Sequence, residues 1–255
     1  MIPYGRQDIS DADIEAVVNV LRSDFLTQGP TVARFEQAVA SRVRAKHAVA
    51  ANSATSALHI ACMAVGVGPG DLVWTVPNTF VASANCARYE GADIDFVDID
   101  PETWNLDVSK LREKLARARR DNRLPKVVVP VHFAGQPTDQ EAIWELASEY
   151  GFRVVEDASH AIGASRNGKP VGSCRWSDIT VFSFHPVKII TTGEGGMALT
   201  NGDGLAERLF MLRSHGITRN PARLRGEEGG ATGRRGSARH RLGTTSSRCS
   251  GTTIE

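Results

Sequence analysis

Residues 126–156 read KVVVPVHFAGQPTDQEAIWELASEYGFRVVE, and this stretch decides the fold class. Its two ends, KVVVPV (126–131) and FRVVE (152–156), are short apolar runs typical of buried strands. Residues 138–149, between them, have the apolar spacing of a helix. A strand, a helix and a second strand in this order predict parallel strands joined by a crossover helix.

The same alternation continues along most of the chain. Residues 10–43 predict two helices, with Ser10 as the N-cap of the first. Further strands are expected at 47–51, 71–76, 93–99, 178–184 and 196–200, and further helices at 55–65, 79–89, 107–119 and 204–214. The pattern predicts an α/β domain with a mainly parallel sheet, which binds ligands at the carboxyl ends of its strands.

Composition and charge exclude several classes of protein. The 255 residues are 41% hydrophobic and carry a net charge of +1, so no basic field attracts nucleic acid or an anionic membrane. No apolar run approaches the roughly 20 residues that span a bilayer, and we expect no signal peptide. The four cysteines (Cys62, Cys86, Cys174 and Cys249) are scattered, which favours free thiols in a reducing cytoplasm over disulfides or a metal site.

The composition changes abruptly near residue 226. Residues 226–255 contain seven Gly and five Arg, and they show neither helical nor strand periodicity. A basic arm for nucleic acid is one interpretation, but a disordered or non-native tail is favoured because the segment cannot form a core. We therefore predict a domain over residues 1–225 and a low-complexity tail over 226–255.

Two segments rich in small and hydroxyl residues could hold a phosphate. Residues 51–58 (ANSATSAL) lie where a strand ends and a helix begins, a position that leaves amide groups free to bind an anion. Residues 191–196 (TTGEGG) permit a tight turn and a close approach of the backbone. Simple N-capping by Ser53 or Thr55, and a flexible hairpin turn, are the structural alternatives.

A carboxylate and a lysine also follow strands. Asp157 comes directly after an apolar run, with His160 three residues later, and Lys188 lies four residues beyond Phe184. Each has an ordinary alternative: Asp157 could cap a following helix, His160 could be structural, and Lys188 could be a solvated loop residue. Together with a phosphate cradle, however, they match the needs of pyridoxal 5′-phosphate (PLP), namely a Schiff-base lysine and an acidic partner for the ring nitrogen.

A second glycine motif imitates a nucleotide-binding loop. Residues 163–169 (GASRNGK) have the outline G-x-x-x-x-G-K, but Pro170 replaces the required Ser or Thr. We interpret the segment as a surface turn between strands.

The sequence resembles the DegT/DnrJ/EryC1/StrS aminotransferases, which aminate keto sugars attached to nucleotides. The motifs that carry the resemblance are IPYGRQDIS (2–10), SDFLTQGPTVARFE (23–36), NSATSALHIA (52–61), PNTFVASANCA (77–87), DFVDIDPETWN (95–105), VVEDASHAIGA (154–164) and FSFHPVKIITTGEGGMA (182–198). They look especially similar to the subgroup that makes UDP-4-amino-4,6-dideoxy-N-acetyl-β-L-altrosamine, a step toward pseudaminic acid.

This resemblance implies an aspartate-aminotransferase-like (type I PLP) large domain and a role for individual residues. Lys188 would form the Schiff base, Asp157 would hold the pyridinium proton, and His160 would lie near the cofactor's 3′-oxygen. Phe80 would stack on the cofactor ring. The phosphate would be bound by Thr55, Ser56 and Ser183.

The resemblance also implies the reaction and the partners. A UDP-linked 4-keto-6-deoxy sugar would receive its amine from L-glutamate, in the cytoplasm, in an enzyme that forms a homodimer. Related enzymes that dehydrate sugars have His where this chain has Lys188, so the lysine favours transamination.

The family's small C-terminal domain is expected to be missing from this chain, because the matching motifs stop near residue 220. A reading-frame shift would explain the tail that replaces it. The alternative function is a truncated, inactive member that binds PLP weakly or not at all.

Overall fold

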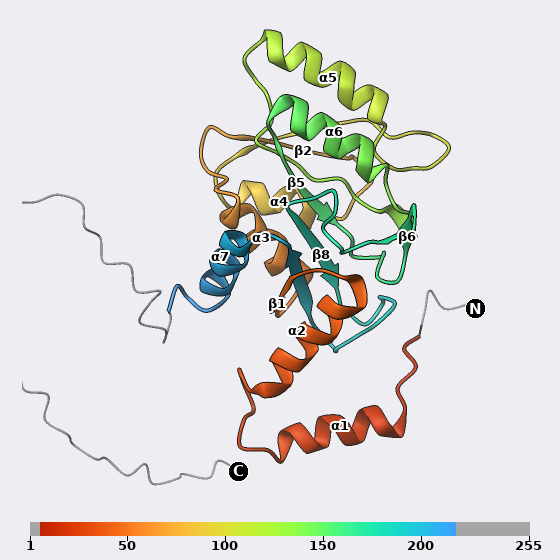
Figure 1. Ribbon diagram of the computed structural model, residues 1–255, viewed down its shortest axis with the longest axis vertical. Coiled ribbons are helices and arrows are strands. Elements are labelled where there is room, and N and C mark those ends of the chain that lie inside the picture. The colour runs from red at the N-terminus through yellow and green to blue at the C-terminus, as the bar shows by residue number, and fades with distance from the viewer. Residues whose placement is uncertain (1–5, 218–255) are drawn as a thin grey trace, which may run out of the picture. The chain divides into compact units, whose positions relative to one another are not determined.

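The computed structural model describes residues 6–217, and these form a seven-stranded sheet in the order β1-β9-β8-β5-β4-β2-β3 (Figure 1). The strands are β1 His47–Ala51, β2 Leu72–Thr75, β3 Asp93–Phe96, β4 Val127–Val128, β5 Arg153–Asp157, β8 Ile179–Ser183 and β9 Gly196–Thr200. β3, β2, β4, β5 and β8 run parallel to one another, whereas β9 is antiparallel to both β8 and β1. The mixed, mainly parallel sheet confirms the predicted fold class.

Helices connect these strands, and side-chain caps start several of them. They are α1 Asp11–Leu21, α2 Pro30–Val43, α3 Ala54–Ala64, α4 Ala82–Arg88, α5 Val108–Arg120, α6 Gln140–Tyr150 and α7 Asp203–Arg213, with a short 3-10 turn at Phe133–Gly135. Ser10 caps α1 as predicted, in a capping box with Asp13. Ser53, Asp107 and Asp139 accept amide hydrogens at the starts of α3, α5 and α6.

The core has a layer on each face of the sheet, and strand β5 shows how the sequence builds both. Successive side chains of a strand point to opposite faces. Val155 packs in one cluster with residues of α3, α4 and α7, and Val154 packs in another with residues of α5 and α6. The next two residues of β5, Glu156 and Asp157, continue this alternation, so they lie under different helices.

The predicted elements occur at the predicted places, but their lengths differ. The run 126–131 pairs as a ladder only at Val127–Val128, because Pro130 has no amide hydrogen to donate. Residues 163–169 lie in a small antiparallel ribbon, β6 Ser165–Arg166 and β7 Lys169–Pro170, which confirms a turn between strands.

Two further predictions concern the ends of the chain and the membrane. The boundary at 225/226 and the tail 226–255, with Cys249, lie outside the described residues. Within residues 6–217, no helix has both the length and the apolar composition needed to cross a bilayer.

Candidate active site at the carboxyl ends of the parallel strands

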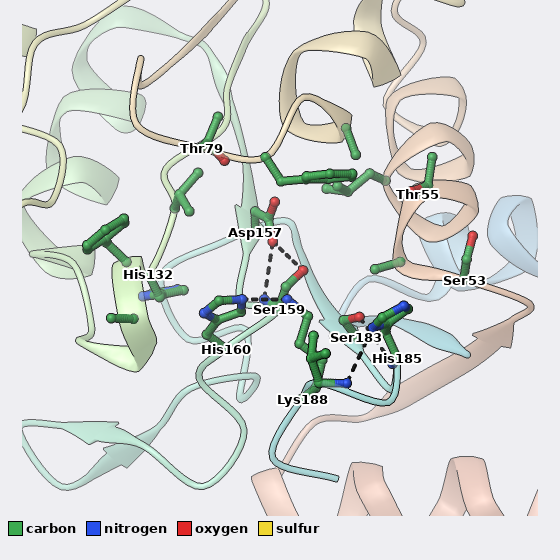
Figure 2. A pocket seen from close by; sticks show the side chains of 18 of the residues that line it. Ser53, Thr55, Thr79, His132, Asp157, Ser159, His160, Ser183, His185 and Lys188 are labelled. Atoms are coloured by element: carbon green, nitrogen blue, oxygen red, sulfur yellow. Dashed lines mark hydrogen bonds between the residues drawn. The ribbon is translucent and has the colours of Figure 1, made fainter. Parts of the chain in front are cut away.

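A cavity of about 510 Å³ lies beyond the carboxyl ends of β5 and β8 (Figure 2). Of the residues predicted for the site, it is lined by Thr55, Phe80, Asp157, His160, Ser183 and Lys188. These residues come from α3, the segment before α4, β5 and the turn after it, β8, and the loop between β8 and β9. The sheet therefore brings together residues that are more than 130 positions apart in the sequence.

Lys188 lies on the loop between β8 and β9, half-buried, with its Nζ in contact with His160 Nε2. Burial lowers the pKa of the Lys188 amine, and the Asp157 carboxylate opposes this shift. Burial and the Lys188 charge both lower the pKa of the His160 imidazole, again against Asp157. The site therefore favours a lysine that gives up its proton more readily than an exposed one.

Asp157 is buried at the end of β5, where its carboxylate accepts three hydrogen bonds. Ser83 Oγ donates to Oδ2 at 2.6 Å, and Ser159 donates to Oδ1 through its amide at 3.1 Å and its hydroxyl at 2.6 Å. No helix begins directly after Asp157 in the described part of the chain, so the alternative that it caps one is wrong, and the bonds from Ser159 close a local turn instead. The same carboxylate also lines the cavity, so its contacts with Ser159 do not remove it from the site.

The start of α3 lines one corner of the cavity. Ser53 Oγ accepts the amide of Ser56 at 3.1 Å. The amides of Ala54 and Thr55, in the first turn, have no intrahelical acceptor, and both residues line the cavity. Ser183 lines it as well, and Figure 2 shows Ser53, Thr55 and Ser183 on the same side of Asp157.

Gly196 allows this corner to pack against the sheet. A Cβ at residue 196 would lie 2.3 Å from the carbonyl carbon of Ser53 and 2.4 Å from the amide nitrogen of Ala54. Only glycine lets the first residue of β9 approach the helix start so closely. The predicted role of the glycines at 193–196 thus has a structural basis at Gly196. The hydroxyl groups of Thr191 and Thr192 instead bond to backbone carbonyls of Phe184 and Glu194.

Ser56 is the predicted site residue that the structure does not place in this cavity. Its Oγ accepts a hydrogen bond from Ser53 Oγ at 3.1 Å. Its side chain lines a second cavity, between α2, α3 and α7. Phe80, in contrast, lines the first cavity with 74% of its surface exposed, so its ring is free to stack on a planar ligand.

Sequence reasoning missed three residues that shape the site: Ser83, Ser159 and His132. Ser159 had a signal, since a serine two positions after an aspartate commonly closes a local turn. Ser83 and His132 had none, because their contacts with β5 depend on the order of strands in the sheet.

The groups present fit PLP. A half-buried lysine, a buried carboxylate, an exposed aromatic ring and a helix start for the phosphate surround one cavity. The fold and this site define the cofactor-binding domain of a type I PLP-dependent enzyme. The chain matches the DegT/DnrJ/EryC1/StrS aminotransferase family model over residues 7–237, and it belongs to this family.

Named relatives and solved structures agree with this membership. The chain is 42% identical over 219 residues to the UDP-4-amino-4,6-dideoxy-N-acetyl-beta-L-altrosamine transaminase of Campylobacter jejuni, covering 86% of this chain and 56% of that protein. Helicobacter pylori PseC, an aminotransferase of pseudoaminic acid biosynthesis, matches with a TM-score of 0.79 and 34% identity, over 86% of this chain and 57% of PseC.

The PLP form of the putative sugar aminotransferase Spr1654 from Streptococcus pneumoniae matches with a TM-score of 0.75 and 30% identity, over 86% of this chain and 59% of that one. The family uses PLP, as the solved PLP and PMP forms of Spr1654 illustrate. The chain spans a little over half the length of the relatives it matches.

Proposed function

We propose that this chain carries the PLP-binding half of a transaminase that converts a UDP-linked 4-keto-6-deoxy sugar to the 4-amino sugar, with L-glutamate as amino donor. The observation that carries the proposal is the meeting of the Lys188 amine and the buried Asp157 carboxylate in one cavity beside a helix start. The substrate and its place in pseudaminic acid-type surface glycan synthesis rest on the names of the C. jejuni and H. pylori relatives.

The residues of the site divide the work of transamination between them. When bound, PLP supplies an electron sink for the pair of electrons left on the α-carbon of the amino donor. Lys188, whose pKa burial lowers, would hold the cofactor through its amine, which loses its proton more readily than that of an exposed lysine. With the cofactor held there, the Lys188 Nζ would be the base that accepts and returns the proton of the donor's α-carbon.

Asp157 and His160 set the conditions for that proton transfer. The Asp157 carboxylate would hold a protonated ring nitrogen, and the bonds from Ser83 and Ser159 keep it in place. His160 contacts the Lys188 Nζ, and its lowered pKa favours the neutral imidazole, which can accept a hydrogen bond from the lysine. A lysine at residue 188 supports amino transfer over the dehydration carried out by relatives with histidine there.

The proposal includes a cytoplasmic homodimer. Cys62, Cys86 and Cys174 are buried free thiols, which suits a reducing compartment. Ile14, Val17 and Leu21 of α1 are more than half exposed and offer an apolar face to a second subunit. Sedimentation of the purified chain at several concentrations tests the dimer, and a single monomeric species at every concentration would contradict it.

The test of the cofactor assignment is covalent trapping at Lys188. The purified chain is incubated with PLP, reduced with borohydride and digested, and we expect the pyridoxyl mass on the peptide that contains Lys188. Lys188→Ala should remove the adduct and the transfer of amino groups. Lys169→Arg, an exposed lysine of the β6–β7 ribbon, is the matched control and should change neither.

Two outcomes would contradict parts of the proposal. An adduct that persists in Lys188→Ala refutes the lysine assignment. An adduct on Lys188 without amino transfer to any UDP-keto sugar contradicts the proposed activity and supports a PLP-binding domain that is inactive by itself.

A further inference from the structure

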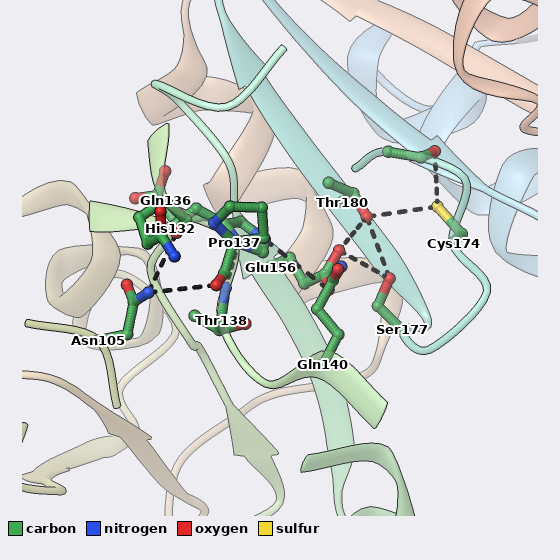
Figure 3. A network of polar contacts seen from close by, with 12 residues as sticks. Asn105, His132, Gln136, Pro137, Thr138, Gln140, Glu156, Cys174, Ser177 and Thr180 are labelled. Atoms are coloured by element: carbon green, nitrogen blue, oxygen red, sulfur yellow. Dashed lines mark hydrogen bonds and ion pairs between the residues drawn. The ribbon is translucent and has the colours of Figure 1, made fainter. Parts of the chain in front are cut away.

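Glu156, the neighbour of Asp157 on β5, is a buried acidic residue that the mechanism does not use. Its side chain is 1% exposed and, by the alternation of a strand, lies on the face of the sheet opposite to Asp157. Figure 3 shows Glu156 beside Gln140, Ser177 and Thr180. Gln140 Nε2 donates to Oε1 at 2.5 Å, and Thr180 and Ser177 donate to Oε2 at 2.6 and 3.2 Å. Such a set of donors is what a buried carboxylate needs to stay ionised.

The surrounding groups favour the charged form of Glu156. Burial alone would raise the Glu156 pKa, but the nearby His132 and the hydrogen bonds from Thr180 and Gln140 outweigh it and lower the pKa. Burial, together with the Glu156 charge, raises the pKa of the Cys174 thiol to about 12, although hydrogen bonds from Thr180 and Ser177 oppose the rise. Cys174 therefore stays protonated, with the acceptors Thr180 Oγ1 and Gly172 O each 3.5 Å from its sulfur, and the Thr180 hydroxyl donates to Glu156.

His132 connects this buried carboxylate to the cofactor cavity. Its ring lines the cavity, and its Nδ1 accepts the amide hydrogen of Thr138 at 3.1 Å. Nδ1 therefore carries no proton, and the ring proton sits on Nε2. That Nε2 lies 3.8 Å from Glu156 Oε1 and, within residues 6–217, has no hydrogen-bond partner.

The main chain of His132 is joined to the strand that carries Asp157. His132 N donates to the Asp157 carbonyl at 3.0 Å, and Asp157 N donates to the Pro130 carbonyl at 2.9 Å. A change in the His132 ring therefore acts on the backbone that positions the Asp157 carboxylate.

We propose that Glu156 is a positioning residue of the cofactor site: its carboxylate, which faces His132 Nε2, stabilises the Nε2-protonated tautomer that the Thr138 amide also favours, and this tautomer fixes the cavity wall beside Asp157. The inference rests on the proposed function only in naming the cavity's ligand. Glu156→Gln has nearly the same shape, but a carboxamide must keep its oxygen towards Thr180 and Ser177. Its NH₂ group then faces His132 Nε2 and Gln140 Nε2, so it opposes a proton on His132 Nε2 while the Thr138 amide still favours one.

The test measures the tautomer directly on the full, cofactor-free chain. The imidazole ¹⁵N shifts of His132 are recorded at neutral pH and assigned by their loss in His132→Gln. In the wild type we expect the proton on Nε2, and in Glu156→Gln we expect the ratio of the two tautomers to change roughly tenfold. PLP should also bind Glu156→Gln roughly tenfold more weakly.

Thr180→Val is the matched control because it removes a donor on the Oε2 side and leaves Oε1 facing His132. It should lower stability without moving the His132 tautomer. If Glu156→Gln does not fold, Glu156→Asp can be used instead. Its side chain is one methylene shorter, so the carboxylate lies farther from His132, and the ratio of the two His132 tautomers should change in the same direction.

A wild-type proton on Nδ1, or equal tautomer shifts in Glu156→Gln and Thr180→Val, would overturn the inference. Because the shifts are read without cofactor, they do not depend on whether Lys188 is trapped by PLP.

Discussion

Replacing Gly196 with alanine tests whether the start of α3 depends on its close packing against the first residue of β9. Gly196 begins β9 and pairs with Ala51 of β1 on one side and Ser183 of β8 on the other. The new Cβ would lie 2.3–2.4 Å from backbone atoms of Ser53 and Ala54. Carbon atoms in ordinary contact are about 3.5–4.0 Å apart, so the helix start or the strand must move by more than about 1 Å.

The expected loss of stability depends on which atoms can move to relieve the clash. Overpacking typically costs about 1–3 kcal/mol, and we take about 3 because both sides of the clash are backbone held by a ladder or a helix. The lower entropy of the unfolded alanine chain returns about 0.5 kcal/mol. We therefore expect Gly196→Ala to lower the free energy of unfolding by about 2.5 kcal/mol.

The assay is equilibrium urea unfolding, followed by tryptophan fluorescence, together with a PLP-binding titration. Gly204→Ala in α7 is the control, since a Cβ there meets nothing within 4 Å, and it should stabilise by about 0.5 kcal/mol. PLP should bind Gly196→Ala more weakly, because the clash would move the amides at the start of α3, which we propose bind the phosphate of PLP. A Gly196→Ala chain within about 0.5 kcal/mol of wild type and with unchanged PLP affinity would refute the packing argument.

Four further changes have expected outcomes. Asp157→Asn should weaken PLP binding by about 10- to 100-fold in an absorbance titration, because it removes the charge that we propose faces the ring nitrogen. Ser83→Ala should weaken it by only about fivefold, since Ser159 still holds the carboxylate. Lys188→Met should raise the free energy of unfolding at pH 7. The pKa of Lys188 is lower in the folded than in the unfolded chain, so the wild type gains stability as pH rises toward the unfolded pKa of about 10.4. Urea titrations should therefore show the difference in free energy of unfolding between Lys188→Met and wild type becoming smaller as pH rises. Leu111→Ala in α5 should cost about 3 kcal/mol in urea unfolding, from a fully buried site away from the cavity.

The fold could be predicted because nearly every buried strand is a short apolar run bounded by polar residues. Both β1 and β9 have the residues expected for them, and Asp157 could be placed at a strand end from its position after FRVVE. Strand order could not be predicted in this way. The neighbours of β5 are β4 and β8, which are separated from each other by about 50 residues of sequence, and their pairing depends on long-range packing.

That unpredictable order decides which side chains complete the site. Ser83 reaches Asp157 because α4 covers the face of the sheet towards which Asp157 points. His132 reaches both Asp157 and Glu156 because β4 lies directly beside β5. No spacing in the sequence joins residues 83, 132 and 157, so a search for motifs finds the lysine and the aspartate but not the residues that hold them.

Periodicity accounts for the remaining difference between prediction and structure. Thr55 and Ser56 are adjacent hydroxyl residues in a motif expected to bind phosphate, but successive residues of a helix point about 100° apart. Thr55 therefore lines the cofactor cavity while Ser56 lines the cavity on the other side of the helix start. On β5 the repeat is two, so the adjacent acids Glu156 and Asp157 must face opposite sides of the sheet. The same chain geometry that places Ser56 in the other cavity thus supplies a second carboxylate behind the wall of the site, where it can act only through a neighbour such as His132.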